Sequence, residues 1–261
     1  MRRWLTAVGL AMTLVLVGLS ALTVVNRMAR QTIQEEHIYG FKGKAVSIDL
    51  TVGEVAIVPG TVEDQILVRR QLTYGLRRPF VEERINGDTF EVRDGNCAMP
   101  VQTFCHVKWL LQVPPQLHLS VTTTTGAINV LPGMTGAVNL VSTSGAVTAR
   151  GSAGPATQLL SHKGAVKGIG IRSSHVVATS ESGNISLSFR NAPKFVQGKS
   201  KTGSVEVVLP DGNESYKIIA RTDGGLRTIP GDQDENATRR ITVESQKGNV
   251  TVEKASGTTG S

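Results

Sequence analysis

A short unit that recurs along the second half of the chain constrains the fold more than any other feature. It consists of a small or polar residue, a glycine, any residue, an aliphatic residue, any residue and a second aliphatic residue, as in Thr125-Gly126-Ala127-Ile128-Asn129-Val130. The eight glycines of the units are Gly126, Gly136, Gly145, Gly164, Gly183, Gly203, Gly224 and Gly248. Their spacings of 10, 9, 19, 19, 20, 21 and 24 residues describe a repeat of about 20 residues. Such a repeat is typical of a solenoid, in which each coil stacks on the next.

The apolar residues change parity at the glycine, which predicts a corner in the chain. Val121 and Thr123 precede Gly126 at even spacing, and Ile128 and Val130 follow it with the opposite parity. A two-residue corner would return the aliphatic side chains to the interior, and we expect it to need a positive φ that glycine adopts at low cost. Roughly six coils between Gly126 and Gly248 would stack to about 29 Å.

An antiparallel β-sandwich with a glycine turn every ten residues or so is the alternative fold. Hairpins of a sandwich favour Asn-Gly or Asp-Gly loops, whereas most of the repeat glycines follow Ser, Thr or Lys. Aromatic residues make up only 4% of the chain and glycines number 28, which argues against a helical bundle. The sequence therefore predicts an all-β protein with a Gly-cornered β-solenoid, similar to a parallel β-helix, over residues 116–254.

The segment before the repeats predicts further strands. Alternating apolar patterns mark residues 45–50, 65–69, 81–85, 89–92 and 107–113 as strands. Asn86-Gly87-Asp88 is a hairpin signal between two of them. Pro114-Pro115 ends the last strand, because proline cannot donate to a sheet. We expect residues 38–115 to form a strand-rich N-terminal part of the same domain.

The N-terminus predicts a membrane anchor. Trp4 to Val25 is a run of 22 residues without a charge, and as a helix it would span about 33 Å against a hydrocarbon core of about 30 Å. A cleaved signal peptide is the alternative, with small residues for a peptidase at Gly18-Leu19-Ser20. The apolar run continues past that point, which favours an uncleaved single-pass anchor. Residues 1–3 would then be a cytoplasmic tail, 4–25 the anchor in the bilayer, 26–37 a stalk and 255–261 a flexible tail.

The two cysteines bear on the location of the domain. Cys97 and Cys105 are the only cysteines and enclose Pro100, and one close pair in a loop predicts a disulfide formed outside the cytoplasm. A metal site would need two more ligands, and only His106 is close. We therefore expect a cell-membrane protein whose C-terminal domain is extracytoplasmic.

Charge and motifs exclude several function classes. Of 28 Lys and Arg, four lie in residues 1–30, which leaves 24 against 21 acids, an ordinary balance that does not indicate nucleic-acid binding. The five histidines are scattered, and neither HExxH nor GxSxG occurs. The acidic run 232–236 lacks the glycine and the final glutamate of a calcium loop. We expect no catalytic residue, no cofactor site and no metal site.

The glycine units that follow a membrane anchor resemble those of the bacterial putative-adhesin family, a group of β-strand repeat domains of the cell envelope without an assigned function. The resemblance covers about Gly43 to Lys254, and the Cys97–Cys105 loop followed by Val113-Pro114 is similar to the actinobacterial branch. It implies a non-catalytic envelope protein and brings no catalytic residues.

Three functions remain open. The first is adhesion, in which the solenoid surface contacts an envelope protein or a wall polymer. The second is a sensory or regulatory partnership with another membrane protein. The third is an enzyme acting on polysaccharides, which would need carboxylates gathered on one face. Glu181, Glu206 and Glu244 lie apart in the repeat, so the sequence favours adhesion over catalysis.

Overall fold

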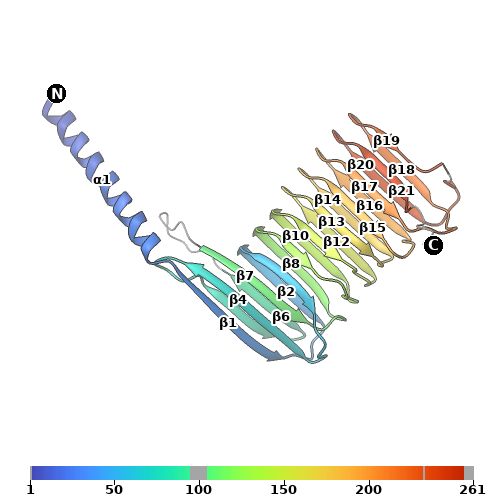
Figure 1. Ribbon diagram of the computed structural model, residues 1–261, viewed down its shortest axis with the longest axis horizontal. Coiled ribbons are helices and arrows are strands. Elements are labelled where there is room, and N and C mark those ends of the chain that lie inside the picture. The colour runs from blue at the N-terminus through green and yellow to red at the C-terminus, as the bar shows by residue number, and fades with distance from the viewer. Residues whose placement is uncertain (1, 95–104, 232, 256–261) are drawn as a thin grey trace, which may run out of the picture.

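The computed structural model describes residues 2–94, 105–231 and 233–255. It contains one helix, α1 (Arg2–Met28), followed by strands that form two sheets. The helix extends away from the strands at the N-terminal end of the molecule (Figure 1). In the part of the chain that the structure describes, no helix has the combination of length and apolar character needed to cross a bilayer.

The strands of the N-terminal part are divided between the two sheets, which we call sheet A and sheet B. They are β1 (Gln31–Gly40), β2 (Ala45–Val52), β3 (Glu54–Pro59), β4 (Gln65–Tyr74), β5 (Val81–Asn86), β6 (Thr89–Asp94) and β7 (Cys105–Val113). Sheet A begins with the order β1-β4-β7-β3, and sheet B ends with the order β2-β6-β5. β5 and β6 form the expected hairpin, with Asn86 opposite Thr89 and Gly87 at a φ of 57°.

The strands of the repeat region alternate strictly, even numbers in sheet B and odd numbers in sheet A. They are β8 (His118–Thr125), β9 (Ile128–Val130), β10 (Val138–Ser144), β11 (Val147–Arg150), β12 (Ala156–Ser161), β13 (Val166–Ile171), β14 (His175–Ser180), β15 (Ile185–Phe189), β16 (Phe195–Ser200), β17 (Val205–Leu209), β18 (Lys217–Thr222), β19 (Arg227–Thr228), β20 (Arg240–Ser245) and β21 (Val250–Lys254). All neighbours in this region pair in parallel. The described residues thus form a two-sheet solenoid of seven coils here, where about six were expected (Figure 1).

The core lies between the two sheets. Along β15, Ile185, Leu187 and Phe189 are buried, and the serines between them are not. This alternation of period two places one aliphatic row from each coil in the interior, as the repeat predicted. The largest buried side chains, Trp109 and Phe90, lie in the N-terminal strands.

The repeat glycines stack at the corner that leads from sheet B to sheet A, and close backbone contact explains them. A Cβ on Gly145 would lie 2.0 Å from the Gly126 oxygen, and a Cβ on Gly164 would lie 2.3 Å from the Gly145 oxygen. Of the eight predicted corner glycines, which all lie in the described residues, Gly126 alone has a positive φ. The expectation that these corners need positive φ is therefore wrong for the other seven. Glycine is required because each coil sits against the carbonyl of the coil before it.

Two of the eight predicted corner glycines lie outside this stack. Gly136 lies at the opposite corner, where its Cβ would meet the Leu117 oxygen at 2.0 Å. Gly224 is not in the stack, since a Cβ there would meet nothing closer than 3.5 Å, whereas one on Gly225 would lie 2.3 Å from the Gly248 oxygen. We define the glycine ladder as the stacked series Gly53, Gly126, Gly145, Gly164, Gly183, Gly203, Gly248 and Gly225.

Hydroxyl groups bind the carbonyls of the glycine ladder from inside the core. Ser161 donates to the Gly145 oxygen at 2.8 Å, and Ser180 donates to the Gly164 oxygen at 3.1 Å. The same bond is made by Ser142 to Gly126, Ser200 to Gly183, Ser245 to Gly203 and Thr222 to Gly248. Each coil therefore satisfies an acceptor of its neighbour, which explains why a buried serine lies three residues before Gly145, Gly164, Gly183, Gly203 and Gly248.

The last two coils stack in the reverse of their order along the chain. β20 lies between β16 and β18, and β21 lies between β17 and β19. The coil formed by β18 and β19 therefore ends the solenoid although it is not the last along the chain (Figure 1). Arg227 and Thr228 of β19 are exposed, and polar residues suit a terminal coil that no further coil covers. The wider glycine spacings of 21 and 24 residues supply the chain for this exchange.

Two N-terminal expectations differ from the structure. The predicted stalk over residues 26–37 is wrong, because α1 continues to Met28 and β1 begins at Gln31, paired antiparallel to β4. No sheet ends at the expected boundary between residues 115 and 116, because β2 pairs with β8 and β3 with β9. Main-chain hydrogen bonds thus run from the N-terminal strands into the repeats in both sheets.

Candidate functional site

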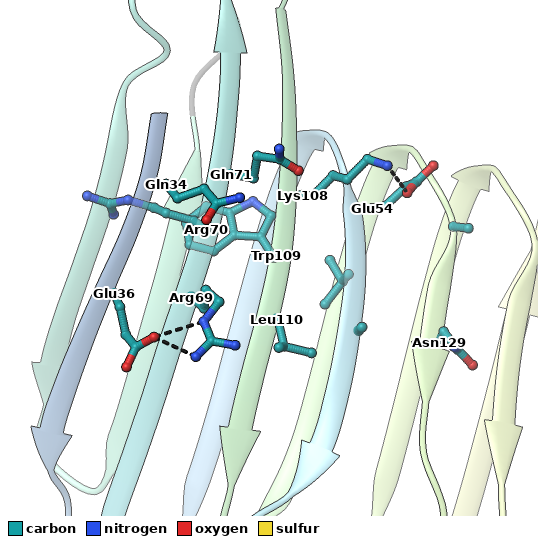
Figure 2. Close-up of a pocket in the computed structure, with 13 residues that line it drawn as sticks. Gln34, Glu36, Glu54, Arg69, Arg70, Gln71, Lys108, Trp109, Leu110 and Asn129 are labelled. Atoms are coloured by element: carbon teal, nitrogen blue, oxygen red, sulfur yellow. Dashed lines mark hydrogen bonds and ion pairs between the residues drawn. The ribbon is translucent and has the colours of Figure 1, made fainter. Parts of the chain in front are cut away.

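The outer face of sheet A is hollowed where the antiparallel strands meet the solenoid. We call this hollow the sheet A groove; its volume is about 920 Å³. Five adjacent strands, β1, β4, β7, β3 and β9, carry its residues (Figure 2). It is lined by Gln34, Glu36, Glu54, Val55, Ala56, Arg69, Arg70, Gln71, Lys108, Trp109, Leu110, Ala127 and Asn129.

Four charged side chains of the groove form two ion pairs. Arg69 donates to Glu36 from Nε at 2.8 Å and from Nη2 at 2.6 Å, across the β1–β4 pairing. Lys108 Nζ lies 3.7 Å from Glu54 Oε2, across the β3–β7 pairing. Figure 2 shows both pairs on the outer face of the sheet. Each pair is formed by cross-strand neighbours of opposite charge, so the groove carries little net charge.

The uncharged groups of the groove are amides and small apolar side chains. The side-chain amides of Gln34 and Gln71 have no hydrogen-bond partner among the described residues, and Asn129 Oδ1 is a buried atom that also has none there. Ala56 and Ala127 contribute only small side chains to the lining, and Leu110 adds an apolar surface. Free amide donors and acceptors beside apolar patches can bind neutral ligands rich in hydroxyl or amide groups.

A second hollow of about 560 Å³ continues from the groove toward the end of α1. It shares Gln71 and Lys108 with the groove and adds Arg30, Thr32, Thr73, Cys105 and His106. Thr32 and Thr73 face each other across the β1–β4 pairing, with 3.3 Å between their hydroxyl oxygens. The polar surface of sheet A therefore extends along the strands.

A buried charge cluster beneath the groove holds these strands in place. Arg70 binds Glu35 of β1 at 2.6 Å and also binds Glu83 of β5, whose side chain is only 3% exposed. Tyr39 donates to Glu83 at 2.5 Å, and the Arg70 guanidinium lies 6.0 Å from the Trp109 ring. The cluster links strands of both sheets through charge-assisted hydrogen bonds, which are stronger than neutral ones.

The pKa values of the cluster reflect its burial and its pairing. Burial alone would raise the pKa of Glu35, but hydrogen bonds and charges from Arg70 and Arg78 outweigh it and hold that pKa below its usual value. Burial and the hydrogen bond to Glu83 raise the pKa of Tyr39 to about 12. Glu35 therefore stays ionised and Tyr39 stays a donor, as a structural network requires.

None of the residues that line the sheet A groove was a candidate site residue in the sequence. Cys97 falls outside the described residues, so the Cys97–Cys105 disulfide stays a prediction; Cys105 begins β7. His37 Nδ1 lies 3.3 Å from Glu83 Oε2, and on the solenoid His162 Nδ1 lies 3.2 Å from Glu181 Oε1. Across residues 2–94, 105–231 and 233–255, no three His, Cys, Asp or Glu side chains gather as metal ligands would.

The comparisons with known proteins concern the family and the fold. The Toastrack DUF4097 family pattern matches residues 82–259. The chain belongs to this family. The Toastrack match begins within β5, so β1, β3 and β4, three of the five strands that line the groove, precede it. No curated protein matches the chain.

Three solved structures are similar to this Toastrack protein at low identity. A putative adhesin of Bacteroides fragilis is 14% identical, with a TM-score of 0.46, and the match covers 86% of this chain and 97% of that one. A putative cell adhesion protein of Clostridium sporogenes is 13% identical, with a TM-score of 0.37, over 85% and 100% of the two chains. A putative lipid binding protein of Parabacteroides distasonis is 9% identical, with a TM-score of 0.40, over 85% and 97%. At these values the likenesses identify neither a ligand nor an activity.

Sequence reasoning missed the groove because it missed two of the strands that form it. The segment of β1, QTIQEEHIYG, is polar on both faces, and its inward Glu35 is paired with Arg70 of β4 and with Arg78. The segment of β3 begins directly after Gly53, ahead of the eight units that begin at Gly126. The unit Gly53-Glu54-Val55-Ala56-Ile57 has the same glycine and aliphatic spacing, so this signal was present in the Toastrack sequence.

Proposed function

We propose that this Toastrack protein is a non-catalytic adhesion protein of the cell envelope, and that the sheet A groove binds a neutral polar polymer of the wall. The observation that carries the proposal is the pairing of charges in the groove. Glu36 and Glu54 are engaged by Arg69 and Lys108, while the amides of Gln34 and Gln71 have no partner among the described residues. Such a surface offers hydrogen bonds without net charge, which suits a ligand of hydroxyl and amide groups.

The anchor is part of the proposal. The uncharged run over residues 4–25 supports attachment to the bilayer by a single pass. Residues 26–261 would then lie outside the cytoplasm, where the groove can meet the wall. Labelling of intact cells with a membrane-impermeant thiol reagent after mild reduction tests this orientation. Modification of Cys105 in intact cells is expected, and modification only after lysis would contradict it.

The chemistry of the groove favours binding over catalysis. Hydrolysis of a glycan by acid and base groups needs two carboxylates free to exchange protons with the substrate. Glu36 accepts two N–H groups of Arg69, and Glu54 lies within ion-pair distance of Lys108. Both carboxylates are thus engaged by cations, which suits binding better than proton transfer.

Retention of the full chain in detergent on purified, insoluble cell wall tests the groove. The double variant Gln34→Ala/Gln71→Ala removes two free amides, and two lost hydrogen bonds are expected to weaken retention about tenfold. The matched control is Gln158→Ala/Gln197→Ala, which removes two exposed amides from the outer face of sheet B.

The groove proposal requires that retention persists at about 1 M salt, where the Debye length is about 3 Å, and that only the sheet A variant loses it. Equal loss in both variants would contradict the groove as the site. Release of the protein by salt would contradict a neutral ligand. A specific protein partner recovered by crosslinking, in place of wall polymer, would instead support the sensory or regulatory function.

A further inference from the structure

Three arginines from successive coils surround a hollow at the corner that leads from sheet A back to sheet B. Arg150 ends β11, Arg172 follows β13 and Arg190 follows β15. Together with Pro132, Gly133, Gly151, Ile169 and Gly170 they line a space of about 280 Å³. We call this site the arginine corner. It shares no residue with the sheet A groove.

The backbone keeps the arginine corner open. The register between β13 and β15 shifts between Gly168 and Ile171, so the chain bulges at this point. Gly151 and Gly170 have φ values of 56° and 61°, which other residues adopt only with strain. A Cβ on Gly170 would lie 3.3 Å from Arg190 Nε, so a side chain there would crowd the guanidinium. Glycine at these positions leaves the floor of the hollow bare.

The main-chain donors of the corner are already engaged, so the floor is fixed and the arginines are the free groups. Gly151 N donates to the Ile169 oxygen at 2.8 Å, and Gly170 N donates to the Ser188 hydroxyl at 2.9 Å. Arg172 N and Arg190 N also bond to main-chain oxygens of neighbouring coils. The side chains of these two residues and of Arg150 are exposed and line the hollow.

The three arginines have no counter-charge in the described part of the chain. No described carboxylate lies within ion-pair distance of Arg150, Arg172 or Arg190. By contrast, Arg69 and Arg84 are both paired with glutamates in the N-terminal strands. Coils of a solenoid stack about 4.8 Å apart, so like charges on successive coils repel each other unless an anion lies between them.

We propose that the arginine corner is a binding site for a phosphate group, carried either by a phosphate-containing polymer or by a lipid headgroup. Guanidinium groups form two parallel hydrogen bonds with phosphate oxygens and are weakly hydrated, which makes arginine the preferred residue for this anion. A tetrahedral phosphate can accept donors from three directions. A planar carboxylate fits a single guanidinium better than three that approach from different coils.

Calorimetric titration of the full chain in zwitterionic detergent with short-chain polyphosphate tests the site. Arg172→Gln and Arg190→Gln are each expected to weaken binding about tenfold, the loss of one charge-assisted pair. The matched control is Arg227→Gln, which removes the same charge from exposed β19 at the end of the solenoid and is expected to leave the affinity unchanged. Arg172→Lys keeps the charge but not the fork of donors, and an intermediate affinity is expected.

A second arm distinguishes the sources of the phosphate. Sedimentation with vesicles of phosphatidylglycerol, compared with vesicles of phosphatidylcholine, measures headgroup binding. A polyphosphate affinity that depends on Arg172 supports a polymer ligand, and a phosphatidylglycerol preference that depends on Arg172 supports a headgroup. Either result supports the site. The proposal is overturned if both measurements are insensitive to Arg172→Gln and Arg190→Gln, or if Arg227→Gln weakens binding equally, because the attraction would then be one of general charge.

Discussion

Replacing Gly183 with alanine would place one methyl group inside the glycine ladder. Its Cβ would lie 2.1 Å from the Gly164 oxygen, 2.5 Å from the Gly164 carbonyl carbon and 3.0 Å from Ala165 N. All three neighbours are main-chain atoms held in parallel sheets, so no side chain can turn aside to make room. The φ of Gly183 is not positive, so the cost comes from contact alone.

The magnitude of the Gly183→Ala effect has two parts. Overpacking of a closely packed site costs about 1–3 kcal/mol. Displacing the Gly164 carbonyl also breaks its 3.1 Å hydrogen bond from Ser180, and a buried acceptor without a partner costs about 1–3 kcal/mol. The free energy of unfolding should therefore fall by about 2–6 kcal/mol, which at a slope of about 2 kcal/mol per M lowers the urea midpoint by about 1–3 M.

Two further glycine variants separate contact from backbone conformation. Gly87→Ala meets no atom within 4 Å but has a φ of 57°, so strain alone should cost about 1 kcal/mol. Gly231→Ala meets no atom and has no positive φ, so its effect should lie within about 0.5 kcal/mol. Urea unfolding of the three full-length variants, followed by circular dichroism, gives the comparison. If Gly183→Ala cost no more than Gly87→Ala, the close-contact account of the ladder would be wrong.

Three more predictions concern single side chains. Ser180→Ala should lower the free energy of unfolding by about 1–3 kcal/mol, because the Gly164 oxygen loses its donor. The control Ser186→Ala on the outer face should cost less than about 0.5 kcal/mol. Equal urea midpoints for the two variants would contradict this prediction. Arg70→Ala should cost about 3–5 kcal/mol because buried Glu83 loses its arginine partner and, among the described residues, keeps only Tyr39 and His37. Arg70→Ala/Glu83→Leu should recover part of the loss in the same assay. Burial raises the pKa of Asp94 from 3.8 to about 6 despite hydrogen bonds from Thr51 and Val52, so ionised Asp94 weakens the fold above that pH. Relative to Asp94→Asn, the natural chain should therefore gain stability as the pH falls from 7 toward 4. A relative loss of stability would show that the pKa is lowered instead.

The solenoid could be predicted from sequence because its signal is local and repeated. Each coil contributes a glycine and two aliphatic residues at fixed offsets, and Gly126-Ala127-Ile128-Asn129-Val130 is buried in the expected alternation. The sequence does not reveal why the corner residue is glycine. A corner with positive φ and a corner pressed against a carbonyl both exclude other side chains. Only the stacking distance between coils distinguishes them.

The order of the last coils depends on contacts between distant segments. β20 could stack on either β16 or β18 with the same glycine pattern, and it stacks on both. The wider spacing around Gly225 and Gly248 indicated extra chain but not its path. Periodicity identifies coils and does not specify their spatial sequence.

The groove was beyond sequence reasoning because its residues come from five strands with no common motif. Gln34, Gln71 and Asn129 are ordinary outward polar residues of their strands, and only the sheet order brings them to one surface. The inward Glu35 of β1 removed the apolar alternation by which a strand is recognised. A buried ion pair can replace apolar residues in a core, and this replacement conceals a strand from hydrophobic patterning.

Photocrosslinking in intact cells tests most directly whether the sheet A groove binds the envelope. A photoreactive side chain at Gln71 lies in the groove, and the same side chain at Gln158 lies exposed on the outer face of sheet B. The account predicts a crosslink from position 71 to wall polymer and a much weaker one from position 158. Equal crosslinking from the two positions, or none from position 71, would contradict the groove as the binding surface.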